Sequence, residues 1–149
     1  MPFFSEGDMF GWKRRAHRDK DIESAADPAP LIGVEVVGVP HDDNSSFLRG
    51  SALAPPRIRE ALASASSNLW TENGIDLGQA SGWRMGEDLV FAEPDNALAE
   101  IEEQIRSRLS QPCRVISLGG DHAINYPILR AHKQFYPELT LVYLDAHPD

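Results

Sequence analysis

Two carboxylates and an imidazole stand at alternate positions in the last five residues, Asp145-Ala146-His147-Pro148-Asp149. Pro148 disfavours the helical region for His147 and favours an extended backbone there. In an extended segment residues two apart share a face, so Asp145, His147 and Asp149 are expected to point the same way. Such a cluster is costly without a cation. Mixed carboxylate and imidazole ligation suits manganese or iron, whereas structural zinc sites usually recruit several thiolates and this chain has one cysteine.

A second polar group, Gly119-Gly120-Asp121-His122, follows a short apolar run. His122 is a candidate metal ligand. Asp121 is a candidate helix N-cap, a group that supports a ligand by a hydrogen bond, or a ligand itself. The glycine pair would also suit a phosphate-binding turn, but the GxGxxG spacing is missing. The two polar groups together predict a metal site.

Each polar group comes directly after a predicted strand, residues 114–118 (RVISL) and residues 139–144 (LTLVYL). Residues 123–136 between them have helical periodicity. Continuous apolar strands are typical of parallel sheets covered on both faces. A strand, helix and strand in this order form a right-handed crossover with parallel strands. Both polar groups are therefore expected at the carboxyl edge of one sheet, where open α/β sheets bind ligands.

The remaining elements are predicted from periodicity and from helix-starting residues. We expect a strand over 31–39, a helix opened by Pro55-Pro56, a possible short strand at 88–90 and a helix from about 96 to 109. Residues 1–30 are charged and aperiodic and are predicted to be a polar extension, which leaves 31–149 as the folded part.

Composition narrows the class of partner. The chain has 149 residues, enough for one domain, and a net charge of -9, which disfavours nucleic acid and anionic membranes as partners. No run approaches the roughly 20 apolar residues that a membrane span needs. The single cysteine is compatible with a reducing compartment, and no export signal follows Arg14-Arg15, so a cytoplasmic location is expected.

The two metal motifs resemble the first two signature motifs of the ureohydrolases, the arginase and agmatinase family. Residues 38–47 and 54–59 also resemble the N-terminal region of that family, and are most similar to its agmatinase-like branch, which includes plant arginases. The resemblance covers about residues 31–149, and Ala123 stands where the family usually has serine. It implies a three-layer α/β/α fold with a mainly parallel sheet, of the arginase and deacetylase type.

The resemblance also implies a role for each candidate ligand around two manganese ions. His122 resembles the histidine ligand of one ion and His147 that of the other. Asp145 resembles the carboxylate that bridges both ions. Asp149 resembles a ligand of the ion on the His122 side that also hydrogen-bonds the bridging hydroxide, which makes it the candidate catalytic residue. That hydroxide would attack the guanidinium carbon of agmatine or arginine and release urea and an amine.

Family members are considerably longer, and a later strand supplies a further Asp-x-Asp pair, so we interpret residues 31–149 as a truncated, N-terminal part of a ureohydrolase domain. Four ligands do not satisfy two Mn²⁺ ions, and we expect the 149-residue chain alone to be inactive. The alternatives are a fragment with at most weak metal binding, a formimidoylglutamase-like relative and, less favoured by Asp145-Ala146-His147, a deacetylase-like hydrolase. The partner expected is a small guanidino substrate, with assembly into a homo-oligomer such as a trimer or hexamer.

Overall fold

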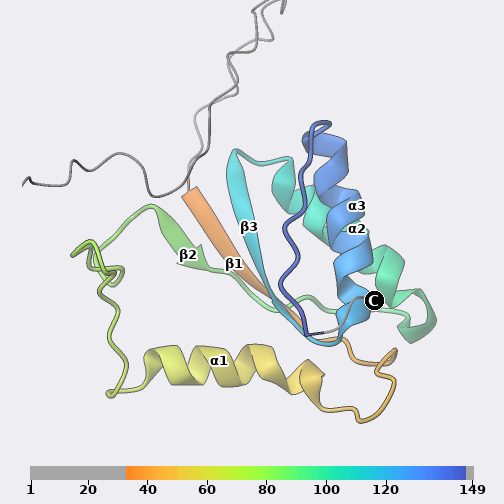
Figure 1. Cartoon of the computed structure of the whole chain (residues 1–149), viewed down its shortest axis with the longest axis horizontal. Helices are drawn as coiled ribbons and strands as arrows, with labels where there is room; N and C mark the ends of the chain where they lie inside the picture. Colours follow the sequence, from red (N-terminus) through yellow and green to blue (C-terminus); the bar gives the residue numbers. More distant parts are fainter. Residues whose placement is uncertain (1–32, 147–149) are drawn as a thin grey trace, which may run out of the picture.

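The computed structural model describes residues 33–146, so the predicted extension over residues 1–30 lies outside the described residues. Three strands and three α-helices form its framework, and a short 3-10 turn precedes each helix (Figure 1). In chain order they are β1 (Gly33–Val39), η1 (Ser51–Leu53), α1 (Ala54–Ala63), β2 (Trp83–Met85), η2 (Pro94–Asn96), α2 (Ala97–Leu109), β3 (Cys113–Gly119), η3 (His122–Ile124) and α3 (Asn125–Phe135).

The described sheet has the order β2-β1-β3, and both strand pairs are parallel. Strand β1 lies in the centre and pairs with β3 over its full length, from Gly33 opposite Cys113 to Val39 opposite Gly119. The β-branched residues of β1 favour this extended backbone. The predicted α/β class with a parallel sheet is confirmed, and the strands predicted over 31–39 and 114–118 both belong to that sheet.

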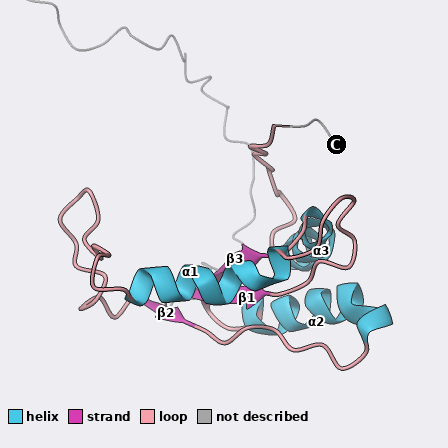
Figure 2. Ribbon diagram, turned by 90° about the horizontal axis from the view of Figure 1, so that it is seen from below, coloured by secondary structure: helices cyan, strands magenta, loops and turns pink. Residues whose placement is uncertain are grey.

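Helices α2 and α3 pack on each other and on the face of the sheet that carries Val37 and Val39 of β1. Ile101 and Ile105 of α2 are four residues apart, so one face of the helix delivers both to this core. Helix α1 instead crosses below the carboxyl ends of the strands (Figures 1 and 2). These carboxyl ends are therefore bordered by α1 and by the loops that follow β1 and β3.

A buried carboxylate connects β1 to two other elements. Glu35 of β1 is buried, and its Oε2 lies 3.0 Å from Nη2 of Arg84 on β2. Its Oε1 lies 3.7 Å from Nε of Arg108 on α2. A buried carboxylate without a cation is costly, and the two arginines supply the opposite charge between the sheet and the helix.

The prediction of a strand over residues 139–144 is wrong. This segment runs in the same direction as β3 in Figure 1, but it stands away from the sheet in Figure 2 and is not a strand. Its apolar side chains are largely in solvent, with Val142 78% and Leu144 93% exposed. An apolar run becomes a strand only where a neighbouring strand pairs with it and other elements cover its side chains. The described residues supply neither for this segment.

The short strand predicted at residues 88–90 is also wrong, although the segment does reach the sheet. Leu89 is buried, and its backbone N–H donates to the carbonyl of Gly38 at 2.8 Å. The strand that pairs with β1 on this side is β2, Trp83–Met85. Its three residues are too few to show the alternation on which the sequence prediction depends.

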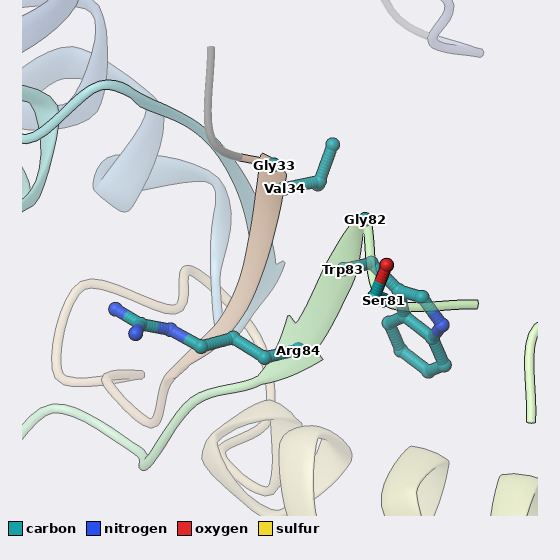
Figure 3. A pocket seen from close by; sticks show the side chains of 6 residues that line it. All are labelled: Gly33, Val34, Ser81, Gly82, Trp83 and Arg84. Carbon is teal, nitrogen blue, oxygen red and sulfur yellow. The ribbon is translucent and has the colours of Figure 1, made fainter. Parts of the chain in front are cut away.

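At the amino end of the sheet, β1 and β2 approach closely beside a pocket of about 200 Å³ (Figure 3). A Cβ on Gly33 would lie 2.5 Å from the carbonyl oxygen of Gly82, and Val34 N–H donates to the same oxygen at 2.9 Å. The side chains of Trp83 and Arg84 leave β2 on opposite sides. The pocket lies at the end of the strands opposite to the motif that contains His122.

Among the described residues, none of the helices combines the length and the apolar character required to cross a membrane.

The two faces of the sheet are covered to different extents. The same isoleucine-to-alanine substitution is therefore expected to cost different amounts of stability on each side. Ile101 is fully buried under the sheet, whereas Ile116 on β3 is 51% exposed. We expect Ile101→Ala to lower the free energy of unfolding by about 2–5 kcal/mol, because it leaves a cavity in the core. Ile116→Ala should cost less than about 1 kcal/mol. Urea denaturation of both variants measures the difference, and an equal loss at Ile116 would show that this face is covered in solution.

Candidate metal centre

The loops that follow β1 and β3 meet at the carboxyl edge of the sheet. Strand β3 ends at Gly119, and the chain turns through Gly120 and Asp121 into η3, which begins with His122. Strand β1 ends at Val39, directly opposite Gly119 in the parallel register. The loop after β1 and the turn with His122 therefore leave the sheet side by side.

The structure brings His122 and Asp145 together, although they belong to different motifs. Their nearest polar atoms, Nδ1 of His122 and Oδ2 of Asp145, are 3.9 Å apart. The hydroxyl of Tyr143 lies 2.7 Å from Nδ1 of His122 and donates a hydrogen bond of 2.8 Å to Oδ2 of Asp145. The rings of His122 and Tyr143 meet edge to face, with centroids 5.6 Å apart. The Asp145 carboxylate and the His122 imidazole thus face each other, and the Tyr143 hydroxyl contacts both.

The other two predicted ligands, His147 and Asp149, lie outside the described residues. Between residues 33 and 146 no group of three or more histidine, cysteine, aspartate or glutamate side chains is arranged to hold a metal ion. The described part of the site is therefore the pair His122 and Asp145, with the Tyr143 hydroxyl between them.

Asp121 is the N-cap of η3. Its Oδ1 accepts the backbone N–H of Ala123 at 3.0 Å, which is the usual geometry of an aspartate cap. Its Oδ2 accepts the backbone N–H of Asn44 at 2.9 Å, a contact with the loop after β1. Both oxygens of Asp121 are engaged by backbone donors. Of the roles considered from the sequence, the cap is confirmed.

The glycine pair before Asp121 is explained by packing. A Cβ on Gly120 would lie 1.8 Å from the carbonyl oxygen of His41, and a Cβ on Gly119 would lie 2.7 Å from Cδ1 of Ile124. A side chain at Gly120 would collide with backbone, which has no freedom to move aside. Gly120 thus lets the turn with His122 contact the loop after β1, and Gly119 leaves room for the side chain of Ile124, so a phosphate ligand is not required to explain the pair.

The loop after β1 has its own anchor, which the sequence analysis missed. The carboxylate of Asp42 accepts the backbone N–H of Gly50 at 2.6 Å and that of Ala52 at 3.1 Å. These hydrogen bonds, that of Gly50 above all, hold the pKa of Asp42 below its ordinary value because they favour the ionised carboxylate. In the sequence, an aspartate early in a long polar loop was the only sign of this anchor. Its partners lie eight and ten residues later in the chain and follow no local pattern.

A pocket of about 530 Å³ lies beside His122. The loop after β1 and the η3 turn line it, with residues 44–48, Ser51 and residues 121–123. Phe47 in its wall is 89% exposed. The predicted ligand His122 therefore borders a space large enough for a small molecule.

A model of the arginase family matches residues 32–149. The mitochondrial arginase 1 of Oryza sativa subsp. indica is 37% identical over 123 residues, which cover 76% of this chain and 36% of that protein. An agmatinase of Halalkalibacterium halodurans is 30% identical over 116 residues, which cover 76% of this chain and 39% of that protein.

The solved structure of the arginase from Medicago truncatula superposes with a TM-score of 0.72 at 32% identity. The match covers 80% of this chain and 41% of that one. The chain thus spans well under half the length of these relatives. The region matched by the family model contains β1, β3 and both predicted metal motifs, and the chain belongs to the arginase family.

Proposed function

We propose that this chain contributes four ligands to the two-manganese site of a hydrolase that cleaves agmatine or arginine to urea and an amine. One observation carries the proposal. His122 and Asp145 come from two separate motifs, yet their polar atoms lie 3.9 Å apart in a chain that belongs to the arginase family.

The donor chemistry of this pair fits a divalent manganese ion. An imidazole nitrogen and a carboxylate oxygen approach each other beside an open pocket, and manganese accepts both kinds of ligand. We propose that His147 and Asp149 complete the contribution of this chain, with Asp145 shared between two ions. When bound, the ions polarise a water molecule for attack and neutralise the charge that develops in the reaction.

The residues of the chain would position the reactants. The η3 turn presents the ring of His122 towards Oδ2 of Asp145. The pocket beside His122 would receive the substrate, and Asp149 would orient the attacking water by a hydrogen bond. The net charge of -9 favours a positively charged guanidinium compound over an anion.

Several finer points belong to the same proposal. The names of the relatives include both arginases and agmatinases, so either arginine or agmatine fits as substrate. A formimidoylglutamase from Bacillus subtilis shares the fold at 23% identity, and this likeness says nothing of activity. Assembly into a homo-oligomer stays a prediction. A cytoplasmic location also stays a prediction, since the rice relative is named as mitochondrial.

The proposed activity is tested in a chimera in which this chain precedes the remaining, unmatched part of the Medicago truncatula arginase. We expect manganese-dependent urea release from arginine or agmatine. Asp145→Asn should lower kcat/KM by at least about 100-fold, because a shared carboxylate is lost, whereas Ala123→Ser should have little effect. Equal effects of the two substitutions, or urea release without manganese in chelator-treated enzyme, would contradict the proposal.

The position of Tyr143 generates a second test, which needs no turnover. Its hydroxyl engages the His122 and Asp145 atoms that we assign to the metal. Tyr143→Phe should therefore tighten Mn²⁺ binding by about two- to tenfold, the equivalent of one hydrogen bond. Calorimetric titration of the 149-residue chain measures this, with Tyr136→Phe at the end of α3 as the matched control. Weaker binding in Tyr143→Phe would mean that the hydroxyl supports the ion instead of competing with it.

A further inference from the structure

We propose that Asp121 is a positioning residue for His122. It fastens the turn that carries this histidine to the loop after β1. The inference deepens the proposed function and depends on His122 being a metal ligand. It is supported by hydrogen bonds of Asp121 that the metal motifs alone do not predict.

Three hydrogen bonds of Asp121 define this tie. Its Oδ1 accepts the N–H of Ala123 at 3.0 Å, within its own turn. Its Oδ2 accepts the N–H of Asn44 at 2.9 Å, 77 residues away in sequence. Its backbone N–H donates to the carbonyl of His41 at 2.9 Å. One residue thus caps the turn and also bonds twice to the loop after β1.

The loop side of the tie is firmly held. His41 is buried at 5% exposure, and its Nε2 lies 2.9 Å from Oδ1 of Asn44. The His41 ring also packs edge-on against Phe91, with centroids 6.0 Å apart. Gly120 approaches the His41 backbone too closely for any side chain. Because the loop is anchored in this way, its hold on Asp121 restricts where the turn can lie.

The position of His122 depends on these contacts of Asp121 with the loop. The His122 side chain is 49% exposed and stands on a turn of three residues, so packing restrains it little. Groups that orient a metal ligand without touching the metal usually change its affinity by about 10- to 100-fold when they are removed. Both carboxylate oxygens of Asp121 already bind backbone N–H groups, which favours such a supporting role over direct ligation.

Two substitutions separate this role from simple capping and from charge. Asp121→Asn keeps the size of the side chain, and asparagine is a good N-cap, but an amide has one acceptor oxygen and cannot serve both donors. Asp121→Glu keeps the charge, but the extra methylene displaces the carboxylate from the two N–H groups. Asp76→Asn is the control, because Asp76 accepts one backbone N–H, from Gly78 at 2.8 Å, and its amide can keep that bond.

The readouts on the 149-residue chain are Mn²⁺ affinity by calorimetry and amide exchange by NMR. We expect both Asp121 variants to bind Mn²⁺ about tenfold more weakly, and Asp76→Asn to stay within about twofold of the unsubstituted chain. The Asn44 amide should exchange faster in both Asp121 variants. The Ala123 amide should stay protected in Asp121→Asn.

Two results would overturn the inference alone. Full affinity in Asp121→Glu with a loss in Asp121→Asn would show that Asp121 acts only through its charge. Unchanged Mn²⁺ affinity in both Asp121 variants, despite faster exchange of the Asn44 amide, would show that the hydrogen bonds of Asp121 to the loop after β1 do not position His122. If neither the unsubstituted chain nor the chimera with the Medicago truncatula arginase binds Mn²⁺, the proposed function fails and the positioning role fails with it.

A third variant tests the tie without changing Asp121. Asn44→Ala keeps the backbone N–H that reaches Asp121 but removes the bond between the Asn44 side chain and His41. It should weaken Mn²⁺ binding by about threefold, as expected when one neutral hydrogen bond that stiffens the loop is lost. If the Asp121 variants do not fold, Asn44→Ala alone tests the positioning role of Asp121. Unchanged Mn²⁺ affinity in Asn44→Ala would then refute the inference.

Discussion

The parallel pairing of β1 with β3 is the constraint on which the rest of the site depends. Seven residues of each strand face one another in unbroken register, from Gly33 opposite Cys113 to Val39 opposite Gly119. Because both strands run the same way, their carboxyl ends stop at one level. The loop after β1 and the turn before α3 are thereby placed in contact, although nearly 80 residues separate them.

The close contact of these two loops imposes a steric condition. The turn after β3 touches the His41 backbone at Gly120, where no larger residue fits. The same contact creates the hydrogen-bonding partners of Asp121, since it brings Asn44 within 2.9 Å of the carboxylate. One packing requirement thus explains both the glycine at position 120 and the second function of Asp121, which follows it.

The second metal motif is held in a different way. Asp145 is brought to His122 without the support of a strand, through the Tyr143 hydroxyl and the course of residues 139–146. Two residues apart in an extended chain, Tyr143 and Asp145 share a face, which is why both reach the same histidine. The first motif is positioned by sheet register and the second by side-chain hydrogen bonds. This difference leaves the first motif better constrained than the second within the described residues.

The sequence by itself determined the local features. The β-branched run of β1, the spacing of Ile101 and Ile105 in α2, and the turn signal of Gly119-Gly120 can each be recognised from neighbouring residues, so strand, helix and turn were predictable there. The motifs also sufficed to identify the family, because their residue types and order are specific. For the same reason His122 and Asp145 were among the four predicted metal ligands, with His147 and Asp149.

Only the tertiary structure decided the features that depend on residues distant in sequence. Whether residues 139–144 form a strand depends on pairing and coverage, which an apolar run does not encode, and in the described fold that segment lies outside the sheet. The burial of Glu35 between Arg84 and Arg108 and the bond from Asn44 to Asp121 likewise join separate elements. Such contacts follow from how the elements pack, and packing is a property of the whole chain that no local pattern contains.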